Sequence, residues 1–399
     1  SSSFAYKRFF MDRAKLDALM DDSGLDALLA SSPENIYYTS RFPVPLTAGN
    51  RGLSLLLRTS EAVAVLLPKG RAPILLCTVG LAGLADVHSP GMETRHSGTG
   101  MHIDWPEGTE RKVNAPTPPE NLSATLKELR LDRGRLGIEM APLSAVTLGR
   151  LQAKLPDLSF ADARPAFFKL RQVKTRAEID RMRHANRVNT AAIRAALEVI
   201  RGGAIEQDVL EAFKSKVREM GCDWESVALG AGPQSGESYN IAGDYVLNPG
   251  DAVRFDVTAV HEFYFSDLSR CATVGDPSAA VRRLYDALLE AQQEMMAAVR
   301  PGVPAAELFR IGVEKVKAAG YGHYARGNMG HGLGLGHYEE PFITPDNDTP
   351  LETGMTLAIE APYYVAGEYG LNVENNVLVT EAGCEVLDDD LSLDLFHCG

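Results

Sequence analysis

The sequence lacks a long apolar run, a cysteine framework and a basic block, and each absence excludes a class of protein. No stretch approaches the roughly 18 apolar residues of a membrane-spanning helix, so we expect no membrane partner. The five cysteines are odd in number and widely spaced, which is typical of neither a disulfide framework nor a zinc ribbon. The net charge is −13 without a long run of Lys or Arg, which argues against nucleic acid as a partner.

A secretory signal is also missing, because residues 1–8 contain no apolar core. Together with the cysteine pattern, this predicts a soluble protein of the reducing cytoplasm. A length of 399 residues provides material for two domains, each able to bury its own core. The composition, 45% hydrophobic and 23% charged, is that of an ordinary globular protein.

The first 160 residues alternate short apolar runs with amphipathic helical patterns, an order typical of an α/β layer domain. The apolar runs lie at 53–57, 62–67 and 73–77, and the helical patterns lie near 11–22 and 121–130. Residues 95–119 differ, with four prolines, three glycines and few apolar side chains. A loop of this length is usually functional or mobile. We interpret it either as a lid or as an ordinary solvent-exposed loop.

Residues 155–165 are expected to link this domain to a second one, which gives domains of 1–160 and 161–399. The second domain begins with a capping box, Thr175 followed three residues later by Glu178, which predicts a helix that ends before Gly202. Further helical patterns lie near 205–219, 278–299 and 304–319. The order of helix pair and strands occurs twice, so we predict an α/β (α+β) fold whose second domain is internally duplicated.

Two aspartates and two glutamates of the second domain lie in segments that resemble buried strands. Asp256 and Asp267 each occupy a short run rich in β-branched and aromatic residues, which predicts a β-hairpin that brings both carboxylates to one end. Glu360 closes one apolar run, and Glu374 lies within another. A carboxylate in such a segment needs a compensating charge.

Divalent cations would provide that charge, because four neighbouring carboxylates would otherwise raise one another's pKa and repel. With His331, the set offers mostly oxygen ligands and one imidazole, which suits Mn, Co or Zn. A pair of such ions about 3.5–4 Å apart is a common arrangement for activating water. The five residues together, rather than any one of them, predict a site for two divalent metal ions per chain.

In these residues the chain resembles the pita-bread metallopeptidases, and within them the branch of Xaa-Pro dipeptidases (prolidases) and aminopeptidase P, with creatinase as a relative that is not a peptidase. The resemblance rests on the separation of eleven positions between the two aspartates, the separation of fourteen between the two glutamates, and the segments 330–334 (GHGLG) and 337–341 (HYEEP). Segments 170–183 and 24–38 extend it towards the N-terminus, so it covers nearly the whole chain.

The resemblance implies an N-terminal α/β creatinase-like domain followed by a pita-bread catalytic domain, and assembly into a homodimer. It implies that a hydroxide bridging two metals hydrolyses Xaa-Pro dipeptides or similar short peptides. Asp267 and Glu374 would bridge the metals, and Asp256 would complete one metal site. His331 and Glu360 would complete the other, and Glu360 would also relay a proton towards the leaving nitrogen.

Four positions depart from the family pattern. His337, which the resemblance implies to stabilise the oxyanion, lies six residues after His331, where the relatives have a spacing of seven. Tyr239, His261 and Asn372 stand where the relatives have a histidine, a tyrosine and an arginine. We interpret these three residues as a rebuilt specificity pocket and predict that they bind the substrate. Tyr239 is also a candidate catalytic residue.

The lost histidine and arginine help to hold the substrate carboxylate in prolidases, so another cation is needed. Arg95, Arg111 and Arg326 are the candidates. The alternative function is a creatinase-like or lyase-like enzyme acting on a small nitrogen or sulfur compound, and a further alternative is a binding module without activity. The intact ligand set favours the peptidase over both. The remaining histidines, His184 among them, have no ligand spacing and are expected to be surface or hydrogen-bonded residues.

Overall fold

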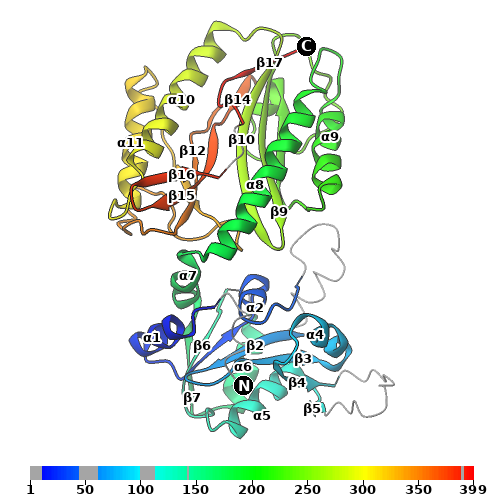
Figure 1. Cartoon of the computed structure of the whole chain (residues 1–399), viewed down its shortest axis with the longest axis vertical. Helices are drawn as coiled ribbons and strands as arrows, with labels where there is room; N and C mark the ends of the chain where they lie inside the picture. The colour runs from blue at the N-terminus through cyan, green and yellow to red at the C-terminus, as the bar shows by residue number, and fades with distance from the viewer. Residues whose placement is uncertain (1–10, 45–61, 99–112, 142, 388–390) are drawn as a thin grey trace. The chain divides into compact units, whose positions relative to one another are not determined.

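The computed structural model describes residues 11–44, 62–98, 113–141, 143–387 and 391–399. The chain forms two units, Ser1–Leu170 and Arg171–Gly399, each with its own sheet (Figure 1). None of the helices in the described residues is long and apolar enough to cross a membrane.

The first unit contains a mixed seven-stranded sheet in the order β5-β4-β3-β2-β1-β6-β7. Its strands are β1 (Ala27–Ala30), β2 (Val63–Pro68), β3 (Ile74–Thr78), β4 (Glu93–Ser97), β5 (Val113–Ala115), β6 (Gly134–Ile138) and β7 (Leu158–Asp162). Its helices are α1 (Arg13–Ser23), α2 (Pro33–Ser40), the short 3₁₀ helix η3 (Val79–Leu81), α4 (Ala82–His88), α5 (Pro118–Glu128) and α6 (Ala145–Lys154). The α/β character expected from the alternating pattern is confirmed.

Two segments of this unit, 155–165 and 95–119, contain secondary structure where a linker and a loop are expected. The segment 155–165 contains β7, which pairs in parallel with β6, and the start of α7 (Arg164–Gln172). The expected linker therefore belongs to the first unit, because Leu158 and Phe160 alternate with polar residues and pack into the core of that unit. The expected loop at 95–119 begins within β4, contains β5 and reaches the start of α5. Its residues 99–112 lie outside the described part of the chain, as does the run at 53–57.

The second unit is built on a sheet in the order β11-β12-β15-β10-β9-β8, with β16 beside β15 and β17 beside β10. Its strands are β8 (Val227–Ala231), β9 (Ala252–His261), β10 (Tyr264–Val274), β11 (Gly330–Gly332), β12 (Thr356–Glu360), β15 (Glu374–Thr380), β16 (Gly383–Val386), β17 (Phe396–Cys398) and the separate pair β13 (Tyr363–Val365) and β14 (Tyr369–Leu371). Its helices are α8 (Arg176–Leu197), α9 (Glu206–Glu219), α10 (Ala279–Ala298), α11 (Ala305–Ala318) and the 3₁₀ helix η4 (Gly232–Gly236).

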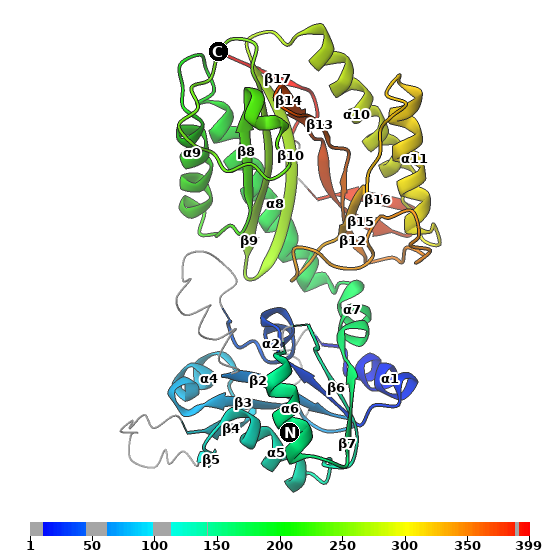
Figure 2. The same ribbon diagram turned by 180° about the vertical axis from the view of Figure 1, so that it is seen from behind.

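The helices of this unit cover the sheet as two pairs, α8 with α9 and α10 with α11 (Figures 1 and 2). The first pair packs on the half that contains β8, β9 and β10, and its core includes Phe213 and Phe255. The second pair packs on the half that contains β12 and β15, and its core includes Leu288 and Leu357. The order of helix pair and strands therefore occurs twice, as the helical patterns predict.

The helix start and the hairpin predicted from the sequence are both present. Thr175 N donates to Glu178 Oε2 at 2.7 Å and Glu178 N donates to Thr175 Oγ1 at 3.4 Å, which completes the capping box at the start of α8. β9 and β10 pair antiparallel along their whole length. The turn between them, Glu262 and Phe263, has positive φ at both residues (45° and 70°), as a tight hairpin turn requires.

Candidate metal centre

Strand register places three of the four predicted acidic ligands in one row across the sheet. Asp256 on β9 pairs with Ser269 on β10, Ser269 pairs with Glu374 on β15, and Glu374 pairs with Glu360 on β12. Directly paired residues point to the same face of a sheet, so the three carboxylates share one face. This row could not be read from the sequence, because the pairing of distant strands has no local signal.

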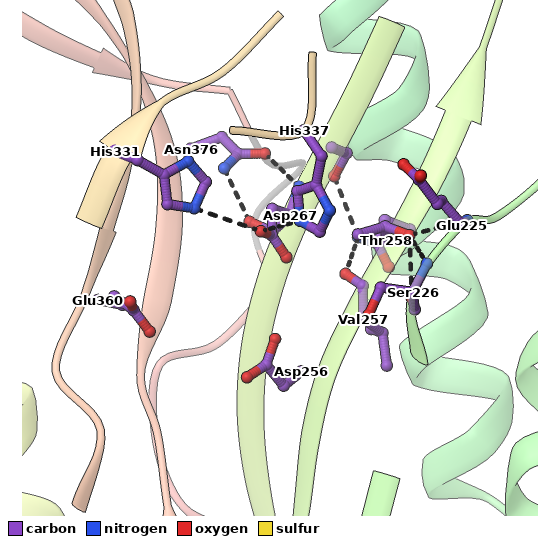
Figure 3. A network of polar contacts seen from close by, with 12 residues as sticks. Glu225, Ser226, Asp256, Val257, Thr258, Asp267, His331, His337, Glu360 and Asn376 are labelled. Carbon is purple, nitrogen blue, oxygen red and sulfur yellow. Dashed lines mark hydrogen bonds and ion pairs between the residues drawn. The ribbon is translucent and has the colours of Figure 1, made fainter. Parts of the chain in front are cut away.

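The adjacent row supplies the other two predicted ligands on the same face. Asp267 lies two residues before Ser269 and pairs with Thr258, and His331 on β11 pairs with Ala358 on β12. Because side chains of a strand alternate between faces, a step of two residues keeps Asp267 beside the acids of the first row. Figure 3 shows the carboxylates of Asp256, Asp267 and Glu360 directed into one space.

Asn376 of β15 fixes the backbone of Asp267. The Asp267 N–H donates to Asn376 Oδ1 at 2.8 Å, and Asn376 Nδ2 donates to the Asp267 carbonyl at 2.7 Å (Figure 3). Both residues are buried, so these hydrogen bonds are shielded from water. The amide therefore substitutes for regular ladder bonds and holds the aspartate in place.

Two histidines contact the carboxylate of Asp267. His337 Nε2 lies 2.7 Å from Asp267 Oδ2, and His331 Nε2 lies 3.7 Å from the same oxygen. The other ring nitrogen of His331, Nδ1, lies 2.9 Å from the carbonyl of Gly332. A carbonyl oxygen only accepts, so Nδ1 carries the proton of the neutral ring and Nε2 presents its lone pair to the carboxylate. Burial lowers the pKa of His331, which keeps the ring neutral.

The pKa of Asp267 is shifted in the opposite direction to the pKa values of the other three acids. Burial and the charge of Asp267 raise the pKa of Asp256 to about 6, and burial and the charge of Asp256 raise the pKa of Glu360 to about 7. Burial and the charge of Asp267 also raise the pKa of Glu374 well above its usual value. Burial acts to raise the pKa of Asp267 too, but the charge and hydrogen bond of His337 outweigh it and lower that pKa.

These observations fit a site for divalent cations. Asp267 Oδ1 is buried and has no hydrogen-bond partner among the described residues. One ligand atom each from Asp267, His331 and Glu374 lies within 4.8 Å of the others. A neutral imidazole lone pair facing a carboxylate places two acceptors together, which a cation between them would satisfy. Hard oxygen donors with one imidazole suit ions such as Mn, Co and Zn.

The loop that carries His337 is held by a buried ionic group. Glu339 lies 3.2 Å from Arg171 and 3.1 Å from Lys174, and it accepts a hydrogen bond from Gly336 N at 2.8 Å. Breaking such a buried cluster by removing one partner typically costs about 3–5 kcal/mol. His337 thus reaches Asp267 despite the altered spacing. Tyr338, seven residues after His331, stacks on His337 with ring centroids 4.4 Å apart.

The three predicted pocket residues occupy very different places. Asn372 is fully buried, and its Nδ2 donates to Glu360 Oε2 at 3.3 Å, so it belongs to the acidic cluster. Tyr239 is 90% exposed, and within the described residues no hydrogen bond joins it to the acids. His261 lies five residues from Asp256 on β9, an odd number, and therefore points to the opposite face of the strand.

Two arginines lie near the acids, and the sequence pointed to Arg326 but not to Arg254. Arg254 is fully buried, and its Nη1 lies 3.2 Å from Asp256 Oδ2. Its position two residues before Asp256 on a strand was the available signal, since that spacing keeps both on one face. Arg326 is the second: its charge lowers the pKa of Glu360 against the larger effect of burial, and its Cζ lies 5.8 Å from the centre of the Tyr364 ring.

Among the cations considered as anchors, Arg326 lies near the acids. Arg95 is bound in the first unit to Glu93 and Glu128 at 2.7 and 2.8 Å. Arg111 lies outside the described residues. Arg326 forms no ion pair within the described part of the chain, and its Nε is buried without a hydrogen-bond partner there.

Comparisons with known proteins agree with this geometry. Residues 180–381 match the model of metallopeptidase family M24, and residues 13–173 match the creatinase/prolidase N-terminal domain. Among solved structures, the chain is similar to a prolidase from Pyrococcus furiosus (25% identity, TM-score 0.76, 94% of this chain and 100% of that chain) and to a dipeptidase from Mycobacterium ulcerans (25%, 0.78, 97% and 96%). It resembles an Xaa-Pro dipeptidase from Bacillus anthracis in fold (24%, 0.81, 96% and 98%).

A curated relative, an uncharacterized peptidase of Staphylococcus aureus (strain MSSA476), is 30% identical over 232 residues. The match covers 57% of this chain and 66% of that relative, just under two thirds of its length. The catalytic-domain model spans half of the chain and includes all five predicted ligands. The chain therefore belongs to metallopeptidase family M24, with a creatinase/prolidase N-terminal domain before the catalytic domain.

Proposed function

We propose that the chain hydrolyses Xaa-Pro dipeptides or similar short peptides at a centre of two divalent metal ions. The observation that carries the proposal is the pair of acceptors formed by His331 Nε2 and Asp267 Oδ2, 3.7 Å apart and buried. Membership of family M24 supports a peptidase, and the names of the similar structures support a short peptide ending in or containing proline.

Five residues would hold the two ions. Asp267 and Glu374 would bind both, Asp256 would bind one of them, and His331 with Glu360 would bind the other. When bound, ions such as Mn, Co or Zn polarise a carbonyl and lower the pKa of water, which is the chemistry that peptide hydrolysis needs.

Side chains of the protein would move the protons and stabilise charge. Glu360 lies at the edge of the cluster and would take a proton from the attacking water and pass it to the leaving nitrogen. His337 must carry a proton on Nε2, because the charged Asp267 can only accept. In place of its contact with Asp267, that N–H would donate to the oxygen on which negative charge develops, a contribution of about 3 kcal/mol in comparable enzymes.

Arg326 is our candidate for the group that holds the substrate carboxylate. It shares the Tyr364 ring with Arg254, whose Cζ lies 5.1 Å from the ring centre. The donors of Arg254 are occupied by Asp256 and by the carbonyls of Ser235 and Glu237. Arg326 has no such partners in the described residues, so its guanidinium remains available for a carboxylate.

Replacement of Arg326 tests this assignment. For a dipeptide with a free C-terminus, Arg326→Gln should raise KM about tenfold to a hundredfold, since a hydrogen bond to a charged group contributes about 1.5–3 kcal/mol. The same dipeptide with an amidated C-terminus should show no such change. Arg150→Gln, an exposed arginine of the first unit, is the matched control. Equal effects on both substrates would contradict the assignment.

A substrate panel tests the function itself. Protein loaded with Mn, Co or Zn would be assayed with Xaa-Pro dipeptides, tripeptides and creatine. Hydrolysis of the dipeptides is expected. Turnover of creatine with no peptide hydrolysis would favour the creatinase-like alternative, for which the buried Asn372 and the exposed Tyr239 are the supporting observations, because neither supplies the cation of the prolidases. A homodimer and a cytoplasmic location remain part of the proposal, and light scattering tests the first.

A further inference from the structure

A second group of metal-ligating side chains lies away from the acidic cluster. His184 comes from the middle of α8, Cys222 follows the end of α9, and His261 is the last residue of β9. One ligand atom from each lies within 4.8 Å of the other two, and all three side chains are half-buried. His261 Nδ1 lies 3.6 Å from Cys222 Sγ, and the two imidazole rings have centroids 3.9 Å apart.

We propose that His184, Cys222 and His261 bind a third divalent cation, of the zinc class, independent of the two ions at the acidic cluster. Two imidazoles and one thiolate form a borderline-soft donor set that favours Zn over the hard ions that carboxylates bind. Three protein ligands leave the fourth tetrahedral position to water.

The backbone already holds these ligands together. Asp223, which follows Cys222, forms an antiparallel bridge with Val260, with N–O distances of 3.1 and 2.7 Å. Cys222 N donates to the carbonyl of Val217 at the end of α9. The backbone that carries Cys222 and His261 is thus fixed, so binding would order little more than the side chains.

The charges around the cluster allow a cation but do not require one. Burial, assisted by nearby positive charge and opposed by Glu262, lowers the pKa of both histidines, which leaves their rings neutral. Burial raises the pKa of Cys222 to about 11, so a bound cation would have to displace the thiol proton. The flanking charged residues are two cations and two anions, namely Arg181, Arg187, Asp223 and Glu262.

Arg187 opposes binding in a way that can be tested. Its Nη2 lies 3.3 Å from His184 Nδ1, and it is exposed, so it can swing into water when a cation binds. Removing this positive charge should therefore tighten the site. The expected gain is roughly twofold to fivefold, the range for exposed charge interactions.

The experiment uses Co²⁺ as a spectroscopic substitute for Zn²⁺ in the full chain. The five ligands proposed for the acidic cluster contain no sulfur, so a near-ultraviolet thiolate-to-cobalt charge-transfer band reports the second site alone. The wild type should show this band and bind one more ion per chain than Cys222→Ser. Cys384→Ser, another half-buried cysteine, should retain both the band and the extra ion.

Two more variants guard against a folding defect in Cys222→Ser. His184→Gln should also lose the band, and Arg187→Gln should reach half-saturation at a lower Co²⁺ concentration, whereas Arg183→Gln should not. A band that survives Cys222→Ser, or equal ion counts in Cys222→Ser and the wild type, would overturn the proposal. The wild type should bind one ion more than Cys222→Ser whether or not the acidic cluster binds metal. A failure of the proposed function therefore does not change the result of this test.

Discussion

The β9–β10 hairpin carries two clusters of potential ligands that differ in depth and in charge. On one face, Asp256 and Asp267 meet the glutamates of β12 and β15 in a cluster of four carboxylates, of which Asp267 and Glu374 are buried. At the turn, on the opposite face of β9, His261 meets Cys222 and His184 in a half-buried group that is neutral without metal. Buried like charges destabilise the protein until cations arrive, whereas neutral ligands can remain empty at little cost. Metal should therefore matter far more for the first cluster.

The largest effect is expected from the bridging acids. Asp267→Asn or Glu374→Gln removes a negative charge shared by both ions while keeping the side-chain shape, so both ions and the activity should be lost. Loss of residues that merely support metal ligands already lowers metal affinity or activity about 10–100-fold, and loss of a ligand should exceed that. Metal analysis and peptide hydrolysis measure the result.

Asp208→Asn, an exposed acid on α9, is the control and should behave as the wild type. Normal metal content and full activity in either bridging variant would show that the register argument has selected the wrong residues.

Metal removal should make stability depend on pH. The folded pKa values of Asp256 and Glu360, about 6 and about 7, lie above their usual values of 3.8 and 4.5. A carboxyl group whose pKa is raised on folding stabilises the folded protein fully at pH values below its pKa in the unfolded chain. This stabilisation is lost as the pH rises through its pKa in the folded protein. The melting temperature of the metal-free protein should therefore decrease as the pH rises from about 4 to about 7.

Glu374, with a raised pKa, adds to this trend, and His331, with a lowered pKa, opposes it below 6.5. Asp267 and His337 do not reverse it. The pKa of Asp267 is lowered, so its contribution to stability is lost only at pH values below its usual pKa of 3.8. The pKa of His337 is raised, so its contribution to stability is lost only at pH values above its usual pKa of 6.5. Divalent cations at about a hundred times Kd should add about 2.7 kcal/mol, or roughly 5–10 °C. Glu360→Gln should flatten the pH profile of the metal-free protein, and an unchanged slope in that variant would refute the assignment.

Sequence reasoning succeeded where the signal is local. The capping box at Thr175, the strands around Asp256 and Asp267 and the apolar segments that carry the glutamates are all visible within a few residues. The hairpin is visible only from its strands, because its turn is Glu262-Phe263 rather than the usual glycine-containing pair.

What the sequence could not supply is contact between distant segments. His184, Cys222 and His261 are separated by 38 and 39 residues, and such spacing resembles no ligand motif. Arg326 could be named as a possible anchor but not preferred to Arg95, since only the structure shows that Arg95 is bound to acids in the first unit. Tertiary packing, which has no short-range pattern, decides both cases.

The smallest effect is expected at Tyr239. This residue is predicted to bind the substrate as a neutral hydrogen-bond donor, and its side chain is 90% exposed. A hydrogen bond between neutral groups contributes about 0.5–1.5 kcal/mol, and exposure to water favours the lower end of that range. Tyr239→Phe should therefore raise KM by about twofold to threefold and leave kcat nearly unchanged, because binding to the ground state and the transition state weakens equally. Steady-state measurement of KM and kcat for Tyr239→Phe and Arg326→Gln under the same conditions compares the two effects. A rise in KM as large as that of Arg326→Gln would place the main anchor at Tyr239, and a fall in kcat alone would assign Tyr239 to catalysis.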